Sequence, residues 1–555
     1  MKRFLALALA LALLLLTGCT SLPDASAPQP FDVSLPDSAP IQLAADGPSP
    51  DSDPSALVTD FLLACAAGAN DDFATARLFL TSASAQEWNP AEQVLIYDTA
   101  TRPLVKSGEE DGDRVAVTIS AQGVASVDAN GVLTRSTDSQ IAATLALVKE
   151  NGQWRIDAPE NAFIISQASF NASYELANLY FPATTGDALV PDPRWYPSRR
   201  LSAHLLKGLI AGPEKGISQA VTSAIPGGTT ISSQGIEVRE GVASVSLEAP
   251  VPESSAARSL LHWQIARTLA QDASISAVEL KVSGIDLGDS PLPEGPTFSL
   301  DTRVGLSESA IGTISAMTVV PLNLAEQPLE GASAPAMSPI THDLVAWRHE
   351  GELRIERGGA EPESARVTQH SSGAPSIDRF DYVWAAAPAG AIAARSDGTV
   401  IEVPIEGGED APVRSVAISP DGARALIVRE GEEGGTLWIG AVLRDTEGAP
   451  RRILGLESGG SYPTGVIDAT WTDGTSFVVA VARADDGRGG GSGLIGVDLG
   501  GFGSAISTPE DIVSLSAGSS AMNLCVLDSR GGVHCRSGAL WQDVPASFKE
   551  IRFPG

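Results

Sequence analysis

The amino-acid sequence predicts a multidomain protein in which two α+β domains precede an all-β C-terminal domain. Three observations lead to this prediction. Apolar residues at helical spacing alternate with short strand-like runs between residues 54 and 288. From residue 336 to 550, short apolar strands recur between turns rich in glycine and aspartate. A proline-rich acidic segment precedes both regions and cannot bury a core.

The composition indicates a folded and strongly acidic protein. The chain has 555 residues, of which 43% are hydrophobic, so several domains with cores of their own are expected. Its 37 Lys and Arg and 68 Asp and Glu give a formal net charge of −31. Such a surface repels phosphate backbones and anionic headgroups, so we expect no nucleic-acid partner, and membrane attachment has to come from a lipid.

The first residues have the pattern of an export signal. A lysine and an arginine precede an apolar run over residues 4–16, which is too short to span a bilayer comfortably. The sequence L-T-G-C at residues 16–19 resembles a bacterial lipobox. The resemblance implies cleavage between Gly18 and Cys19 and a lipid on the Cys19 sulfur, which would anchor the protein on the outer face of the cell membrane. The alternative is an ordinary secretory signal with an incidental cysteine.

The segment after the lipobox is predicted to be a solvated tether. Residues 20–53 contain seven prolines and six aspartates but no lysine or arginine. A random coil of this length spans roughly 30 Å, and a fully extended polyproline form spans roughly 100 Å.

Residues 54–160 are predicted to form the first α+β domain. Leu57, Phe61, Leu62 and Cys65 recur at helical spacing, and a second short helix is expected after residues 70–72. Four strands are expected after the helices: Val94–Tyr97, Val115–Ile119, Ile141–Val148 and Trp154–Ile156.

The order of these elements resembles the NTF2-like (cystatin-like) fold, some members of which are isomerases with a buried aspartate base. Asp98 and Asp157 are the nearest candidates for such a base. No tyrosine or second acid accompanies either of them at a recognisable spacing, so structural roles are expected instead.

Residues 161–197 are expected to be a connection, and residues 198–288 to form the second α+β domain. Leu201, Leu205, Leu206 and Leu209 lie on one face of a helix that ends at Gly212. A hairpin turn at Glu240-Gly241, a helix capped by Ser254 or Ser255 and a strand over residues 278–282 are expected to follow.

The order of motifs in this second domain, L-L-x-G-L-x-x-G-P, A-I-P-x-G-T, E-G-V-A-S-V-S-L and T-L-A-Q, resembles the GerMN domain. The resemblance implies no catalytic residues. His204, His262 and Trp263 lie on core-like helices and are expected to pack rather than to bind a ligand.

The C-terminal region contains a weak repeat of about 40 to 50 residues, a period typical of propeller blades. Its five units are recognised by the apolar strands Leu344–Trp347, Tyr382–Ala385, Ala423–Val428, Ser476–Ala480 and Met522–Val526. The region 336–550 is therefore predicted to be a β-propeller. Residues 289–335 are expected to be a linker or a partial blade, which could complete a sixth unit. An all-β sandwich is the alternative.

Cys525 and Cys535 flank a turn over residues 529–532, and an export compartment would permit a disulfide between them. A zinc site is the alternative, but only His534 lies near these thiols, so no metal is expected. Cys65 is expected to be buried.

No sequence motif indicates an enzyme. The chain lacks the phosphate-loop pattern, G-x-S-x-G, H-E-x-x-H and C-x-x-C. Asp378 and Asp468 are the only acids expected near an inner strand of the propeller, and the acidic pairs 432–433 and 485–486 are expected to be solvated turns. We therefore expect neither catalysis nor a cofactor.

The ordered set of lipobox, acidic tether, NTF2-like domain, GerMN domain and propeller resembles the actinobacterial LpqB family of lipoproteins. The resemblance implies contact with the extracytoplasmic domain of a sensor histidine kinase, that of the Mtr two-component system, and modulation of its signalling in cell-envelope homeostasis. Two alternatives remain. One is a module that binds a cell-wall fragment in the NTF2-like pocket or the propeller channel, and the other is a propeller-based envelope hydrolase.

Overall fold

A computed structural model describes residues 45–288, 291–325, 330–388, 390–407, 411–431, 434–455, 464–483, 491–509 and 511–555, which belong to one compact unit. Gly18, Cys19 and most of the expected tether lie outside these residues, as do the acidic pairs 432–433 and 485–486. Among the described residues, no helix is long and apolar enough to cross a membrane.

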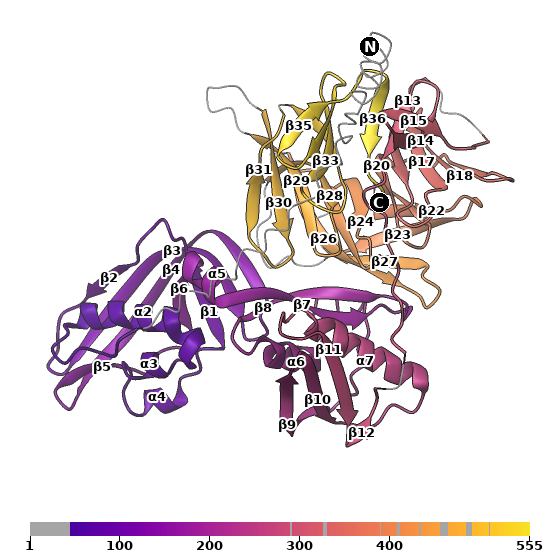
Figure 1. The fold of residues 1–555 in the computed structure, drawn as a ribbon. Coiled ribbons are helices and arrows are strands. Elements are labelled where there is room, and N and C mark those ends of the chain that lie inside the picture. Colours follow the sequence, from indigo (N-terminus) through magenta and orange to yellow (C-terminus); the bar gives the residue numbers. More distant parts are fainter. Residues whose placement is uncertain are drawn as a thin grey trace, which may run out of the picture. The chain divides into compact units, whose positions relative to one another are not determined.

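The first domain packs helices against one face of a curved sheet that is antiparallel except for its last strand pair (Figure 1). The long helix α2 (Pro54–Asp71) begins where the Asp53 carboxylate accepts hydrogen bonds from the backbone N–H groups of Ser55 and Ala56, both at 2.9 Å. Two short helices follow, α3 (Ala74–Arg77) and α4 (Ser84–Glu87). The buried residues Leu57, Phe61 and Cys65 hold α2 against the sheet, so the predicted helix is confirmed.

The strands of this sheet lie in the order β5-β4-β3-β1-β6, with β2 paired to β3. Their bounds are β1 (Gln93–Tyr97), β2 (Leu104–Ser107), β3 (Arg114–Asp128), β4 (Leu133–Glu150), β5 (Gln153–Asp157) and β6 (Phe163–Ser166). The strands β3 and β4 are much longer than expected, because buried and exposed residues continue to alternate along β3 up to Asp128.

Residues 161–197 are more than a connection. Strand β6 pairs in parallel with β1 in the first sheet, and helix α5 (Gln167–Ser173) follows it. The strands β7 (Tyr174–Pro182) and β8 (Leu189–Pro197) then form a two-stranded antiparallel ribbon. Phe170 and Trp195 lie in the core of the first domain, whereas Leu179 and Phe181 lie in the core of the second. The ribbon therefore contributes to both cores, which the sequence analysis did not anticipate.

The second domain packs two helices on a four-stranded sheet with the order β12-β11-β10-β9. Its elements are α6 (Leu201–Ala211), β9 (Thr230–Arg239), β10 (Val242–Glu248), α7 (Ser255–Leu269), β11 (Ala277–Val282) and β12 (Ile285–Asp286). Ser254 caps α7 by accepting the backbone N–H of Ala257 at 3.1 Å. Glu240 and Gly241 have φ values of 50° and 82°, which form the tight turn predicted between β9 and β10.

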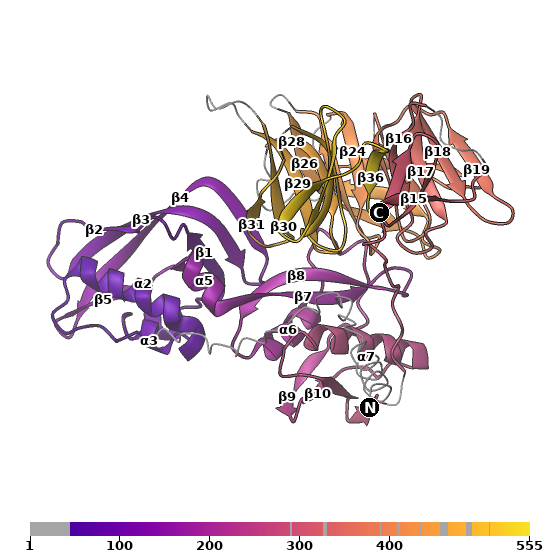
Figure 2. The same ribbon diagram turned by 45° about the horizontal axis from the view of Figure 1, so that its top comes forward.

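The C-terminal region consists of four-stranded blades around a central axis (Figures 1 and 2). Five blades follow one another along the chain. They are blade 1, β16 (Ser333–Met337), β17 (Leu344–His349), β18 (Glu352–Arg357) and β19 (Glu363–Val367); blade 2, β20 (Ser372–Ile377), β21 (Val383–Ala387), β22 (Gly390–Ala394) and β23 (Val400–Glu406); blade 3, β24 (Val413–Ile418), β25 (Arg424–Arg429), β26 (Gly435–Arg444) and β27 (Pro450–Gly455); blade 4, β28 (Thr464–Trp471), β29 (Ser476–Arg483), β30 (Gly491–Asp498) and β31 (Gly503–Ile506); and blade 5, β32 (Ile512–Ala517), β33 (Asn523–Asp528), β34 (Val533–Ser537) and β35 (Leu540–Asp543).

A sixth blade closes the ring by joining the two ends of the region. Its sheet has the order β15-β14-β13-β36, where β13 (Val304–Ser307), β14 (Ile311–Ser315) and β15 (Thr318–Pro321) precede blade 1 and β36 (Phe548–Arg552) is the last strand of the chain. The inner strands β16, β20, β24, β28, β32 and β36 each contact the next, and β36 contacts β16. The sheets thus form a closed propeller and not a sandwich.

Candidate functional site in the propeller channel

The inner strands of the propeller surround a cavity of about 740 Å³. Its mouth is formed by the N-terminal ends of the inner strands, including residues 333–334, 371–374, 413–415 and 513–514. A narrower space of about 40 Å³ continues beyond Asp468 toward the other end of the channel and has room for a few water molecules. The channel is therefore wide at one end and nearly closed at the other.

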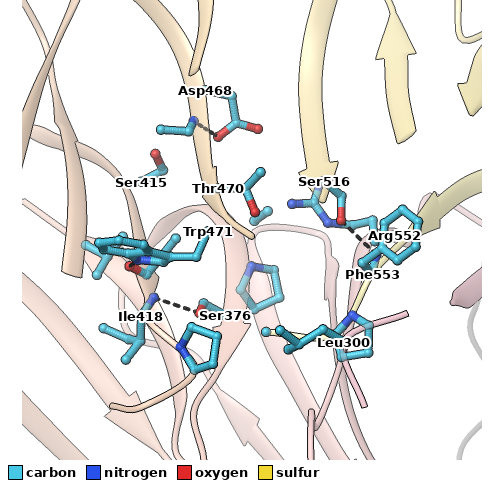
Figure 3. A pocket seen from close by; sticks show the side chains of 18 residues that line it. Leu300, Ser376, Ser415, Ile418, Asp468, Thr470, Trp471, Ser516, Arg552 and Phe553 are labelled. Carbon is cyan, nitrogen blue, oxygen red and sulfur yellow. Dashed lines mark hydrogen bonds between the residues drawn. The ribbon is translucent and has the colours of Figure 1, made fainter. Parts of the chain in front are cut away.

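Side chains at the narrow end fill most of the channel (Figure 3). Trp471 donates its indole N–H to the Ala417 carbonyl at 2.9 Å, and Leu300 and Phe553 line the opposite wall. Leu300 belongs to the segment that enters the propeller, and Phe553 follows its last strand. The segment that enters the propeller, the residues after its last strand and the Trp471 ring all meet at this end. A ligand therefore has to enter from the wide mouth.

Polar side chains join each blade to the next around the channel. The Ser376 hydroxyl accepts the Ile418 N–H at 3.0 Å, and the Ser516 hydroxyl accepts the Phe553 N–H at 2.7 Å. Carboxylates take the same role at two other blade junctions, as described below. These bonds satisfy backbone N–H groups that no strand of the same blade can reach, and they fix the inner strands against one another.

Asp468 lies on β28 and accepts the Leu515 N–H of blade 5 at 2.9 Å. Its other oxygen accepts the Ala469 N–H, also at 2.9 Å. Burial raises the pKa of the Asp468 carboxyl, although Arg552, these two hydrogen bonds and Arg414 all act to lower it. The negative charge of Asp468 is thus only partly compensated by the surrounding protein.

Glu550 lies on β36, between blades 5 and 1. One of its oxygens accepts the Ala334 N–H of blade 1 at 2.9 Å. Burial raises the pKa of the Glu550 carboxyl, with Arg552 and the Ala334 N–H acting in the opposite direction. Arg552 itself donates to the Ser514 hydroxyl at 2.6 Å and to the Leu515 carbonyl at 3.2 Å. The Arg552 guanidinium therefore lies near two half-buried carboxylates without a direct ion pair to either.

Arg348 supplies a buried positive charge at the mouth. Its guanidinium donates to the carbonyl oxygens of Ser371, Ser372 and Gly373 at 2.7 to 3.0 Å, and its side chain is 9% exposed. Burial lowers the pKa of Arg348, and no carboxylate opposes this effect. Arg414, at the start of β24, is exposed and also lines the mouth.

The structure separates the two acids that the sequence placed near inner strands. Asp468 lines the channel, but Asp378 does not. The Asp378 carboxylate lies beyond the end of β20, where it accepts the Trp384 indole N–H at 2.7 Å and pairs with Arg444 at 2.7 Å. Asp378 is thus a fully paired structural group.

The other candidate residues have local structural contacts. In the first domain, Asp98 accepts the Ala100 N–H at 2.9 Å in a turn, and Asp157 accepts the Thr81 hydroxyl at 3.1 Å. In the second, His262 lies 3.0 Å from the Val278 carbonyl, and the His204 ring stacks on Tyr196. Trp263 is half-buried on α7. None of these side chains converges with another on one reacting centre.

The cysteines Cys525 and Cys535 lie directly opposite each other on β33 and β34, with Sγ atoms 2.06 Å apart, as in a disulfide. Cys65 is buried and unpaired. His534 lies between the carboxylates of Asp528, at 3.0 Å, and Asp543, at 2.7 Å. Within the described ranges, no group of three or more His, Cys, Asp or Glu side chains is arranged to hold a metal ion.

Sequence reasoning missed the residues that give the channel its charge, namely Arg348, Arg414, Glu550 and Arg552. Arg348 lies on blade 1, Arg414 on blade 3, and Glu550 and Arg552 on the last strand of the chain, so no local motif connects the three places. Glu550 and Arg552 alternate on β36, and only the recognition of this last strand as an inner strand would have indicated their position.

Three family models match the chain in sequence order. Residues 47–171 match the lipoprotein LpqB N-terminal domain, residues 178–288 match the sporulation and spore germination domain Germane, and residues 315–552 match the lipoprotein LpqB beta-propeller domain. The second and third matches begin earlier than the boundaries expected at residues 198 and 336, because they include most of the β7–β8 ribbon and strand β15 of blade 6.

Relatives of similar length match along most of the chain. A lipoprotein LpqB from Cutibacterium acnes is 26% identical over 95% of this chain and 91% of its own length. A lipoprotein LpqB from Mycobacterium bovis BCG is 29% identical over 86% of this chain and 87% of its own. Among solved structures, TolB from Acinetobacter baumannii aligns with 70% of this chain and 88% of its own, at 12% identity and a TM-score of 0.31. From the three ordered domain matches and the full-length relatives, we conclude that this chain belongs to the LpqB family of lipoproteins.

Proposed function

We propose that this protein is a lipoprotein anchored through Cys19 on the outer face of the cell membrane. There it contacts the extracytoplasmic domain of the Mtr sensor histidine kinase and modulates its signalling. The observation that carries the proposal is the presence of all three domains of the LpqB family in the family's order, behind a lipobox. The anchor supplies the membrane attachment that a net charge of −31 would otherwise disfavour.

Contacts between the propeller and the β7–β8 ribbon support a rigid partner-binding body. Arg379 pairs with Asp187 at 2.8 Å, and Arg424 donates to the Pro191 carbonyl at 2.6 Å. The Trp195 indole N–H donates to the Gly500 carbonyl at 2.6 Å. The propeller face that makes these contacts is therefore occupied by the protein itself, and the face with the channel mouth is left for a partner.

The experiment that tests this proposal is crosslinking in living cells with a photoreactive residue. Val513 at the channel mouth is 48% exposed, and Val400 on the outer strand of blade 2, a matched control, is 41% exposed. We expect a residue at 513, but not at 400, to capture the kinase, identified by mass spectrometry. Capture from neither position, in a strain with normal levels of both proteins, would contradict the proposed surface. The kinase contact itself fails if photoreactive residues on the other domains also capture none.

Tether length provides a functional test of the same proposal. Residues 20–53 set the height at which the folded body meets a membrane-bound kinase, and effective concentration falls when a linker cannot span the required distance. We expect shortening to a few residues to impair a kinase-dependent reporter, and a Gly/Ser segment of equal length to preserve it. Metabolic labelling with a fatty-acid probe, abolished by Cys19→Ala, serves as the control for anchoring. Full activity of a lipidated short-tether variant would contradict the standoff role.

We also propose an NTF2-like fold for the first domain. The support is the packing of α2 against a curved sheet in which β3 and β4 are the longest strands. Among the described residues, none of the best-defined pockets is lined by this sheet alone. Neither Asp98 nor Asp157 lines one of these pockets.

A second candidate function, a ligand-binding module, is favoured by the propeller cavity of about 740 Å³. Ligand sites commonly fall in the range of about 300 to 1,000 Å³. A propeller-based hydrolase has less support, since only Asp468, Glu550 and His349 bring acid–base groups to the lining besides two exposed rim glutamates.

A further inference from the structure

The charged side chains that line the propeller cavity lie on two opposite sides of the ring. Arg348 belongs to blade 1 and Arg414 to blade 3, whereas Asp468 belongs to blade 4 and Glu550 to blade 6. In a closed ring of six blades, blade 1 faces blade 4 and blade 3 faces blade 6. Each arginine is therefore placed across the channel from a carboxylate, although Arg414 is also a neighbour of Asp468.

The remaining charged groups do not cancel this separation. Glu350 and Glu430 line the rim on the arginine side, but both are exposed and therefore screened by solvent. Arg552 lies on the carboxylate side, where its hydrogen bonds go to Ser514 and Leu515. Even with Arg552 present, burial dominates at both carboxylates, so that side of the cavity can accept a further positive charge.

We propose that the mouth of the propeller cavity binds a compact zwitterion, of the class of free amino acids and short peptides. The ligand's ammonium group would lie toward Asp468 and Glu550, and its carboxylate toward Arg414 and Arg348. Charge-assisted hydrogen bonds of both signs favour this class. A neutral sugar would gain nothing from the separated charges, and a polyanion would be repelled by the two carboxylates. This inference deepens the second candidate function and does not depend on contact with a kinase.

Titration calorimetry on the purified full-length protein in detergent tests the proposal, with dialanine as the probe. Two blocked forms serve as matched probes: N-acetyl-dialanine lacks the ammonium group, and dialanine amide lacks the carboxylate. We expect dialanine to bind and each blocked form to bind at least about tenfold more weakly, as for the loss of one charge-assisted hydrogen bond. Absence of dialanine binding at millimolar concentration, or equal binding of glucose, would overturn the proposal.

Two substitutions place the binding in the cavity. Arg414→Gln removes an exposed positive charge, and Glu550→Gln removes a carboxylate charge but keeps an oxygen for the Ala334 N–H. Each should weaken dialanine binding at least about tenfold. Arg451→Gln, on the outer strand of the same blade as Arg414, is the control and should leave the affinity unchanged, because its side chain is 68% exposed and lies far from the axis.

The choice of variants keeps the test decisive. If Glu550→Gln proves unstable in a thermal melt, Arg414→Gln alone determines the outcome, since Arg414 is exposed at the mouth. Unchanged affinity in a folded Arg414→Gln variant would show that the cavity mouth is not the site. The kinase contact is measured separately by crosslinking. A negative result for one proposal therefore does not contradict the other.

Discussion

The two ends of the propeller differ in how completely their charged side chains are paired. At the end next to the β7–β8 ribbon, the buried Asp378 carboxylate pairs with Arg444 at 2.7 Å and accepts three N–H groups besides. At the open end, Arg348 has only neutral acceptors, and burial raises the pKa of Asp468 and Glu550. A charge that is removed from water is tolerated only with compensation. Complete compensation therefore indicates a structural group, whereas partial compensation around an open cavity is consistent with the proposed ligand site.

The strongest way to break this comparison is to remove the paired carboxylate. The side chains of Asp378 and Arg444 are 0% and 4% exposed, so Asp378→Ala leaves a buried guanidinium and the Trp384 N–H without their acceptor. We expect a loss of about 3–5 kcal/mol in the free energy of unfolding, measured by urea denaturation. As a control, Glu406→Ala breaks an ion pair with Arg452 whose side chains are 48% and 41% exposed, and should cost less than about 1 kcal/mol. Similar losses in the two variants would refute the assignment of Asp378 as a structural anchor.

The second prediction concerns the β33–β34 hairpin of blade 5, which contains the disulfide. Cys525 and Cys535 are direct cross-strand partners separated by ten residues, so the loop they close is short. In the chain-entropy model, such a loop stabilises the fold by about 2–3 kcal/mol at most. We expect the Cys525→Ser, Cys535→Ser double variant to unfold at lower urea concentration by no more than this amount. Alkylation under denaturing, non-reducing conditions should label only Cys65, and labelling of all three thiols would contradict the bond.

The third prediction concerns the open end and contrasts directly with the first. Glu550→Gln keeps an oxygen for the Ala334 N–H, whereas Asp468→Asn keeps one for the Leu515 N–H but gives up the acceptor of the Ala469 N–H; both remove a poorly compensated charge. We therefore expect Glu550→Gln to change the free energy of unfolding at neutral pH by less than about 1 kcal/mol, and Asp468→Asn by no more than about 1.5 kcal/mol. If either substitution were as costly as Asp378→Ala, these carboxylates would be structural and the comparison would fail.

The same two carboxylates predict a pH dependence with a definite sign. Their native pKa values are raised, whereas in the unfolded chain they titrate near about 3.9 and 4.3. Between the unfolded and the native values, the native state binds more protons, so their contribution to stability increases as the pH falls through this window. The double variant should lose this contribution. Urea titrations of both proteins at several pH values give the difference, and parallel curves would contradict it.

The sequence predicted the fold more completely than the site because the two depend on different distances along the chain. The helix over Leu57, Phe61 and Cys65, the Glu240-Gly241 turn and the repeated apolar strands of the blades are local patterns, and the structure contains all of them. The β7–β8 ribbon was missed because its buried residues face two cores, which obscures a simple alternation.

The site depends on residues that only ring closure brings together. Arg348 and Glu550 are separated by four blades in the sequence, yet they line one cavity because β36 returns to close blade 6 beside blade 1. Asp378 and Asp468 were equivalent in the sequence, since each follows or lies on an inner strand. Their difference in pairing arises from Arg444, on the third strand of the next blade, and cannot be inferred from spacing.

The smallest expected effect comes from charges at the open end that lie outside the cavity. Burial lowers the pKa of His534, but hydrogen bonds and charge from Asp528 and Asp543 outweigh it, so the native pKa is raised. Protonated His534 therefore stabilises the fold. The contribution is fully present below the unfolded value of about 6.5 and is lost as the pH rises through the higher native value. His534→Gln should remove it, with a change below about 1 kcal/mol because the pair is partly exposed.

An NMR titration of the ring protons tests the sign directly and contains its own control. His204 is expected to titrate on the opposite side of about 6.5, because burial, Lys207 and Arg200 lower its pKa. If His534 titrates below His204, the carboxylates do not hold its charge, and the open end has an uncompensated group outside the cavity as well. The link between incomplete pairing and ligand binding would then lose its support. If His534 titrates above His204, the charge of His534 is paired with Asp528 and Asp543, in contrast to the carboxylates that line the cavity.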